Sequence, residues 1–517
     1  MRRLTNLFSR KPLSLMMQDA EEGGGDGAGI RLKRALGPGN LIMLGIGATI
    51  GAGIFTLTGE AAARWAGPAV VYSFVLAGVL CLLAGLCYAE MASMVPISGS
   101  AYSYSYATMG ELVAWIIGWD LVLEYAFGAV AVAVSWSGYL RSLLVDTLNI
   151  AVPDWMMRLT QSPWDHAPIT LADGSTAAGL WNLPATLVAL AVTFILYRGI
   201  KESALINNVI VVIKVAVVLV FIFLGWAVVD TINWVADASA TGLSSLVPPR
   251  SMMTRGDEVV ESFGWAGVLT GTGLVFFAYI GFDSVSTTAQ ECRNPKRDLP
   301  IGILGTMVVC TALYILMALV LTGIVPYQQL GVPDPIAVGV DRLVHLRGWS
   351  ENAQFIFAVL VKAGVLAGLT SVILVSILGQ TRIFYAMSRD GLLPWFNRVH
   401  PKHQTPHYAT VLTGLATALL AGLMPMSLVG ELVSIGTLLA FMLVCAAVPI
   451  LRLTNPDTPR PFRVPAAWVV APLGALACIW VMSGLPGDTW LRLLVWLSLG
   501  FVVYVAYGYR NSRLRKP

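Results

Sequence analysis

The chain has 517 residues, of which 56% are hydrophobic and only 12% are charged, and its net charge is +4. Soluble domains carry roughly 25% charged residues, so this composition excludes a water-soluble fold and makes the membrane the expected solvent. The six cysteines form no CxxC pair and show no metal-ligand spacing, which argues against a disulfide framework.

The first 34 residues are polar, with a basic start and a glycine run at 23–25. The longest apolar stretch there, 13–17, is too short for the hydrophobic region of a signal peptide. We expect residues 1–34 to be a disordered cytoplasmic tail that ends in the basic cluster 31–34 at the membrane edge.

Twelve segments are long and apolar enough to cross a bilayer as helices, for which about 20 mostly apolar residues are needed. They lie near 40–63, 68–94, 111–140, 182–199, 203–229, 265–290, 300–325, 352–381, 407–425, 428–451, 465–485 and 489–508. The sequence therefore predicts an all-α integral membrane protein with twelve transmembrane helices. The transporter domain would span 35–510, and 511–517 would form a second cytoplasmic tail.

The distribution of Lys and Arg predicts the orientation of these spans. If the N-terminus is cytoplasmic, 23 of the 33 basic residues fall in tails and loops on that side. Eight lie on the opposite side, and Lys214 and Lys362 fall inside spans. We expect a multi-pass protein of the cell membrane with both termini in the cytoplasm.

Two spans contain runs that weaken a helix. Span one has four glycines between Gly45 and Gly53, and span six combines small residues, aromatics and a carboxylate between Gly271 and Asp283. The first run is also compatible with close helix packing through Gly47-xxx-Gly51. A dinucleotide-binding loop does not fit, because no βαβ unit surrounds the glycines.

The two interrupted spans begin corresponding halves of the chain. Because each half has five spans, the sixth span enters from the opposite side, which predicts an inverted repeat of 40–229 and 265–451 with peripheral helices in 465–508. Interrupted helices at corresponding positions of such halves point to a transport site. Freed N–H groups can take a carboxylate and freed carbonyls an ammonium, and an α-amino acid presents both groups.

Several ordered motifs resemble the amino acid–polyamine–organocation superfamily, and most of them resemble its cationic amino acid transporter branch. They are GATIGAGIF at 47–55, FFAYIGFD at 276–283, ECRNP at 291–295, GQTR at 379–382, MSRDGLLP at 387–394 and ELVSIGTL at 431–438. The resemblance implies a five-plus-five inverted repeat with broken helices one and six and two peripheral helices. Animal members of the branch favour arginine and lysine, whereas bacterial twelve-span members often take small neutral amino acids, so the branch does not define the substrate.

The resemblance also implies a set of binding residues. The first break would bind the substrate carboxylate and amine, and the aromatic stretch of span six would cover them. Carried over, the substrate-binding residues are Ile46, Thr49, Ile50, Gly51, Ala52 and Gly53, with Phe277, Ala278, Tyr279 and Phe282. Lys214 matches a family lysine on span five that stands where sodium-coupled relatives bind an ion.

A charge inside the bilayer is costly, so each one is a functional candidate. Lys214 lies too deep in span five to reach either surface, and burial disfavours its ammonium form. Glu124, near the middle of span three, is read as a contact to the substrate side chain or as a proton relay. The alternative is a fixed partner for another helix, a role that we favour for Asp120, one turn earlier.

Span eight supplies the expected partners of Lys214. Counting back from Arg382 places Thr370 and Ser371 at the midplane, and the family analogy makes their hydroxyls proton-coupling partners of Lys214. They could equally bond back to their own helix. The same count puts Lys362 near the outer edge, where its ammonium would reach the interface.

These features together predict a secondary amino acid transporter driven by a proton gradient, with no cofactor and no enzymatic activity. An amino acid/polyamine exchanger, a membrane-embedded enzyme and a substrate-sensing receptor on a transporter fold are the alternatives. No Walker A motif supports ATP coupling, and Pro401 and Pro406 interrupt the His-rich loop that has metal-like spacing. The expected partners are the amino acid and membrane lipid, with no nucleic acid; the pattern defines no oligomeric state.

Overall fold

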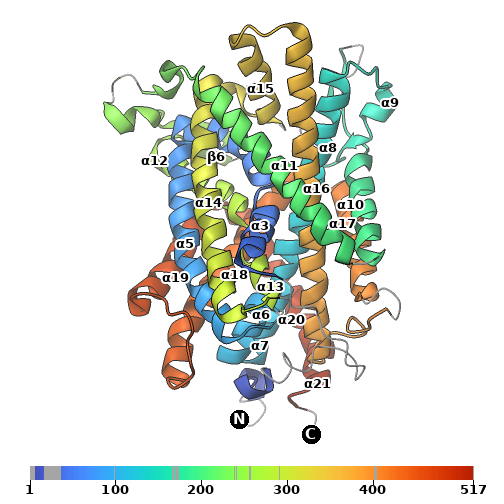
Figure 1. Ribbon diagram of the computed structural model, residues 1–517, viewed down its shortest axis with the longest axis vertical. Coiled ribbons are helices and arrows are strands. Elements are labelled where there is room, and N and C mark those ends of the chain that lie inside the picture. The colour runs from blue at the N-terminus through green and yellow to red at the C-terminus, as the bar shows by residue number, and fades with distance from the viewer. Residues whose placement is uncertain are drawn as a thin grey trace.

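The computed structural model describes most of the chain. The described residues are 6–16, 36–97, 99–165, 169–170, 174–198, 200–237, 239, 241–255, 258–289, 292–332, 334–400 and 405–515. Within them the protein is an elongated bundle of helices, and its few strands lie at one end (Figure 1).

The helices follow one another along the chain; η marks a short 3-10 or π segment. The first half holds η1 (Asn6–Phe8), α3 (Pro38–Thr49), η2 (Gly53–Leu57), α4 (Thr58–Ala61), η3 (Ala62–Ala66), η4 (Gly67–Ala69), α5 (Val70–Met94), α6 (Ser100–Thr108), α7 (Glu111–Val122), η5 (Leu123–Phe127), α8 (Gly128–Arg141), η6 (Ser142–Thr147), α9 (Asp154–Met157), α10 (Leu183–Arg198) and α11 (Ile200–Trp226). The second half holds α12 (Gly264–Val275), η9 (Phe276–Tyr279), α13 (Ser284–Thr287), α14 (Pro295–Ile324), η11 (Tyr327–Gln329), α15 (Pro335–Leu346), α16 (Glu351–Arg389), α17 (His407–Leu423), α18 (Met426–Thr454), α19 (Ala467–Ser483), α20 (Gly487–Val503), η12 (Tyr504–Gly508) and α21 (Tyr509–Asn511).

Helices lie at all twelve places where the sequence predicts a span, which confirms the all-α membrane fold. Eight helical stretches of the described chain are long and apolar enough to cross a bilayer, and α10, α17 and α19 are shorter apolar helices. Proline begins α3, α14 and α15, where its missing N–H costs no hydrogen bond. Pro425 precedes α18 and separates it from α17.

Short strands and connecting segments cover one end of the bundle. They are η7 (Thr231–Trp234), η8 (Gly242–Leu246) and three antiparallel pairs: β1 (Thr160–Gln161) with β4 (Trp181–Asn182), β2 (Ile169–Thr170) with β3 (Thr176–Ala177), and β5 (Ser251–Arg255) with β6 (Glu258–Ser262). Lys362 lies towards this end but does not reach the surface as expected. It is only 2% exposed, and its Nζ donates to the Thr147 hydroxyl at 2.7 Å.

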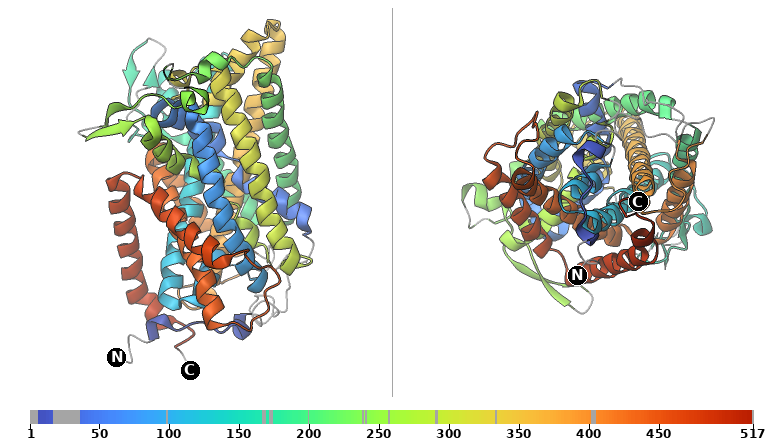
Figure 2. Two further views of the ribbon diagram at one scale, coloured as in Figure 1. Left: turned by 90° about the vertical axis from the view of Figure 1, so that its left-hand side faces the viewer. Right: turned by 90° about the horizontal axis from the view of Figure 1, so that it is seen from below.

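The two halves each begin with an interrupted helix. α12 starts at the end of the bundle opposite to η1 and α21, and α13 lies nearer to those terminal segments (Figure 1). α3 lies inside the bundle, packed against α14, α11 and α16. α19 and α20 lie on the outside (Figure 2), as the two peripheral helices were expected to.

Part of the expected N-terminal tail, residues 6–16, packs against the bundle at the end where the C-terminal segment also lies (Figure 1). Lys11 Nζ forms a buried ion pair with Asp390 Oδ1 at 2.7 Å. From the other terminus, Arg515 pairs with the fully buried Glu111 at 2.8 Å. Residues 17–35 lie outside the described part of the chain.

Candidate substrate site

The first break follows the glycine cluster of span one. α3 ends at Thr49, and Ile50 is extended, with φ −74° and ψ 100°. A π-helical turn then begins at Gly53, and the first hydrogen bond across the new start joins Phe55 N–H to the Gly51 carbonyl at 3.2 Å. The break therefore leaves N–H groups at the start of a helix, where the backbone dipoles favour an anion.

The second break interrupts span six between η9 and α13. Ile280 is extended, with ψ 135°, and Gly281 has φ +110°. A Cβ at Gly281 would lie 2.9 Å from the carbonyl oxygen of Ala48. Glycine is therefore needed there both for its backbone conformation and for the close approach of the first broken helix.

The two breaks are in direct contact. A Cβ at Gly53 would lie 2.2 Å from the Cα of Ala278, so only glycine allows this approach. Tyr314 of α14 holds the two segments together, since its hydroxyl lies 2.7 Å from the carbonyl of Ala278 and 3.0 Å from that of Thr49. The ends of the two broken helices thus pack into one centre.

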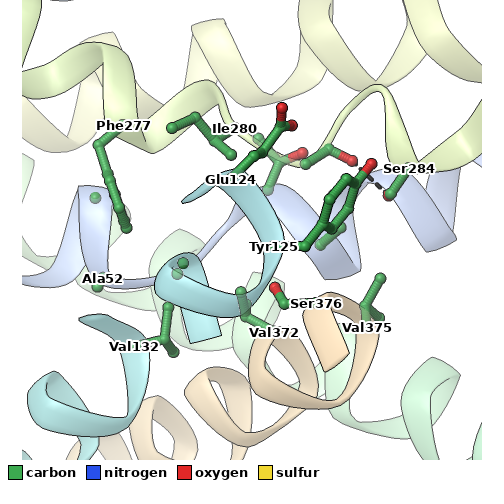
Figure 3. Close-up of a pocket in the computed structure, with 16 residues that line it drawn as sticks. Ala52, Glu124, Tyr125, Val132, Phe277, Ile280, Ser284, Val372, Val375 and Ser376 are labelled. Atoms are coloured by element: carbon green, nitrogen blue, oxygen red, sulfur yellow. Dashed lines mark hydrogen bonds between the residues drawn. The ribbon is translucent and has the colours of Figure 1, made fainter. Parts of the chain in front are cut away.

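A cavity lies beside this centre, and its empty space, open solvent included, is about 430 Å³. It is lined by Ala48, Thr49, Gly51, Ala52, Gly53, Glu124, Tyr125, Gly128, Val132, Phe277, Ile280, Gly281, Ser284, Val372, Val375 and Ser376. In Figure 3 valines from α8 and α16 lie on one side of the cavity, and Phe277 and Ile280 lie on the other. The cavity combines free polar backbone with an apolar compartment.

Six of the expected substrate-binding residues line this cavity. They are Thr49, Gly51, Ala52, Gly53, Phe277 and Glu124. The Thr49 hydroxyl has no hydrogen-bond partner among the described residues. A buried hydroxyl without a partner is costly, so this group suits a polar ligand in the cavity.

The two later aromatic candidates of span six do not line the cavity. Tyr279 is turned towards α5, where its hydroxyl donates to the Phe74 carbonyl at 2.8 Å. Phe282 packs into an aromatic cluster with Tyr88 and Phe441. Both side chains are buried in the protein, away from the cavity lining.

Ile46, Ile50 and Ala278 also lie outside the cavity lining. Ile46 is one turn before the break, and its carbonyl accepts the Ile50 N–H at 3.0 Å. Ile50 instead offers its own carbonyl to Lys214. Ala278 packs against Gly53, between the two broken helices. These three residues shape the centre without facing the open space.

Lys214 of α11 joins the first break to α16. Its ammonium donates to the carbonyls of Gly47 and Ile50 at 2.5 and 3.0 Å and to the Ser371 hydroxyl at 3.1 Å. The side chain is fully buried, and among the described residues no carboxylate pairs with it. A Cβ at Gly368 would lie 3.0 Å from Lys214 Cβ, so glycine on α16 provides the space for the lysine.

Thr370, the other hydroxyl expected to contact Lys214, does not do so. Its Oγ1 accepts from Trp136 at 3.1 Å and donates back to the Leu366 carbonyl at 2.8 Å. Consecutive residues of a helix point about 100° apart, so only Ser371 faces Lys214.

A π-helical bulge, η5, positions Glu124 and Tyr125 so that both line the cavity (Figure 3). Single π-turns of this kind occur frequently at functional sites. The Tyr125 hydroxyl donates to Asp283 Oδ2 at 2.5 Å, immediately behind the cavity. Asp120 is fully buried but is not part of the lining.

Several lining residues were missed from the sequence. Gly128 and Val132 follow Glu124 at four and eight residues, so helical spacing alone places them on the same face. Val372, Val375 and Ser376 follow Ser371, which was identified, on the same helix. Tyr125 depends on the bulge, which no periodicity indicates.

Two helices broken at matching positions, a cavity between them and a buried lysine at the break define a membrane transporter. The chain belongs to the amino acid permease family, whose model matches residues 36–506. It is a permease of the amino acid–polyamine–organocation superfamily, in the cationic amino acid transporter branch. Its family and relatives are transporters and not enzymes.

Three relatives illustrate the range of the family. The chain is 43% identical over 488 residues to the branched-chain amino acid permease BcaP of Bacillus subtilis, covering 94% of this chain and 95% of the relative. It is 41% identical to the methylthioribose transporter of the same organism, over 99% and 100% of the two chains. It is 35% identical to the vacuolar cationic amino acid transporter 4 of Arabidopsis thaliana, over 83% of this chain and 64% of the relative.

Proposed function

We propose that this permease is a secondary active transporter that takes up L-amino acids together with protons across the cell membrane, with both termini in the cytoplasm. The hydrogen bonds of Lys214 are the main support for the proposal. This lysine is fully buried, has no carboxylate partner among the described residues, and bridges the first break and α16. Its protonation would change contacts between the two repeats.

The amino acid backbone would bind at the two helix ends. The N–H groups at the start of the helix around Gly51–Gly53 suit the carboxylate. Carbonyls at the ends of α3 and α12 suit the ammonium, because a helix C-terminus carries partial negative charge. The Thr49 hydroxyl, which has no hydrogen-bond partner among the described residues, would add a polar contact in the same place.

The substrate side chain would lie between α8 and α16. Val132, Val372 and Val375 line that compartment, and Phe277 and Ile280 face them. An aliphatic side chain would replace no hydrogen bond there and would gain apolar contact. The similarity to a relative named a branched-chain amino acid permease supports the same substrate class.

Lys214 would couple transport to protons through its contacts. When protonated it donates to the Gly47 and Ile50 carbonyls and to Ser371, which ties the first broken helix to α16. When it loses its proton to the more alkaline cytoplasm, this tie loosens. A ligand shifts a conformational equilibrium only by its differential affinity for the two states, and the proton would be that ligand.

The test is uptake by purified protein in proteoliposomes with an alkaline interior. We expect radiolabelled leucine to accumulate above its external concentration, and a protonophore to abolish that accumulation. Methylthioribose, which lacks both the carboxylate and the ammonium, is the discriminating competitor. Two results would contradict the proposal: leucine uptake that is inhibited by methylthioribose but by no other amino acid, or leucine accumulation that is unchanged by the protonophore.

A further inference from the structure

Four glycines of the described chain line the substrate cavity, and close packing explains three of them. The four are Gly51, Gly53, Gly128 and Gly281. A Cβ at Gly53 or at Gly281 would collide with the other broken helix, and a Cβ at Gly51 would lie 3.1 Å from Val372. Glycine at these positions lets the breaks and α16 come close together. Gly128 has no such explanation.

Gly128 lies in ordinary helical backbone. It is the first residue of α8, with φ −56° and ψ −45°, and it is buried. Any L residue adopts this conformation, and glycine weakens a helix relative to alanine. A Cβ at Gly128 would meet no atom of the described residues within 4 Å. Neither the backbone nor close packing requires glycine here, so the effect of the missing side chain is open space in the cavity.

The space beside Gly128 belongs to the apolar compartment of the cavity. Val132 is four residues further along α8 and shares the same face, and Val372 and Val375 line the compartment from α16. The helices α8 and α16 pack against each other, which defines the distance between these two walls. Val132 fills its place on the α8 wall with a branched side chain, whereas Gly128 leaves its place empty.

We propose that Gly128 sets the size of the side chain that the site accepts. The space beside it takes the branched end of an aliphatic α-amino acid such as leucine, and the valines of the two walls contact that end. The side chain of alanine is too short to fill this space, so it gains less apolar contact. The proposal deepens the proposed function and rests on its placement of the substrate side chain between α8 and α16.

Gly128→Ala tests the proposal, because it places one methyl group in this space. Binding of radiolabelled leucine and of radiolabelled alanine is measured separately on detergent-purified protein, without a pH gradient. We expect the Kd for leucine to rise about 10- to 200-fold more than the Kd for alanine, since one methyl group in an apolar pocket has an effect of this size. An unchanged ratio of the two Kd values would overturn the proposal. Equal loss of both affinities would also overturn it, because Gly128 would then serve the geometry of the helix.

A control and a rescue separate size from general damage. Gly430→Ala is the matched control, because a Cβ at Gly430 also meets nothing within 4 Å among the described residues, and Gly430 does not line the cavity. Its ratio of leucine to alanine affinity should stay at the wild-type value. Combining Gly128→Ala with Val132→Ala frees volume on the same wall, so this double variant should recover most of the lost preference for leucine. A double variant with no recovery, or an equal shift in Gly430→Ala, would contradict the proposal.

The uptake assay separates this proposal from the proposed function. If Gly128→Ala shifts the preference as expected but the wild type does not accumulate leucine under a pH gradient, the role of Gly128 stands and proton-driven uptake fails. If the wild type accumulates leucine but Gly128→Ala keeps the wild-type preference, uptake stands and the role of Gly128 fails.

Discussion

Replacing Gly53 with alanine is a sharp test of how the two breaks build the site. The added Cβ would lie 2.2 Å from the Cα of Ala278 and 2.5 Å from its Cβ, whereas carbon atoms in contact are about 3.5–4.0 Å apart. The obstructing atoms include backbone, so the broken helices must separate by about 1 Å or more. Overpacking of this kind costs about 1–3 kcal/mol.

If this cost falls on the substrate-bound state, the Kd for leucine should rise by about 5- to 150-fold. Binding of radiolabelled leucine to detergent-purified protein measures the change. Gly430→Ala is the control, since a Cβ at this position near the start of α18 would meet nothing within 4 Å, and alanine is favoured over glycine in a helix. Wild-type affinity in Gly53→Ala would refute the argument that direct contact of the two breaks forms the site.

Three further changes have defined outcomes. Gly51→Leu should abolish leucine binding while the protein still inserts, because its Cβ already lies 3.1 Å from Val372; near-normal binding would move the site elsewhere. Lys11→Met leaves the buried Asp390 without its cation, so the melting temperature should fall by an amount equivalent to roughly 3–5 kcal/mol, and Lys11→Arg should restore most of it. Burial raises the pKa of Asp334, so folding favours the protonated carboxyl. The stability that goes with this protonated form is fully present below about pH 4 and is lost as the pH rises through the raised pKa. Asp334→Asn should then match the wild-type melting temperature in acid and exceed it at neutral pH, and an equal effect at both pH values would contradict this.

The membrane fold was predictable because it depends on segment length and apolar composition, which the sequence displays directly. The positions of both breaks were predictable because the glycines that they require are visible in the sequence. Gly281 is required by its positive φ and Gly53 by its contact with Ala278. The depth of Lys214 in α11 likewise indicated a buried lysine, and Ser371 was correctly named as its contact.

The details of the site were less predictable because they depend on which way each side chain turns. Tyr279 and Phe282 belong to the expected aromatic stretch, yet both side chains turn into the protein, one before the break and one after it. The π-bulge that brings both Glu124 and Tyr125 into the cavity shifts helical phase within one turn. The hydrogen bond from Tyr125 to Asp283 joins residues far apart in the chain, and no spacing rule connects them.

The most direct test of the account is the role of Lys214 in proton coupling. Lys214→Met keeps the length of the side chain and removes its charge, and Lys362→Met makes the same change at a second buried lysine that contacts Thr147 instead of the first break. Both variants are reconstituted beside the wild type, and leucine accumulation is measured under an imposed pH difference.

We expect the wild type and Lys362→Met to accumulate leucine against its gradient. Lys214→Met should exchange leucine across the membrane without accumulating it, because the proton no longer changes the contacts between α3 and α16. Accumulation by Lys214→Met at the wild-type level, driven by the same pH difference, would contradict the account.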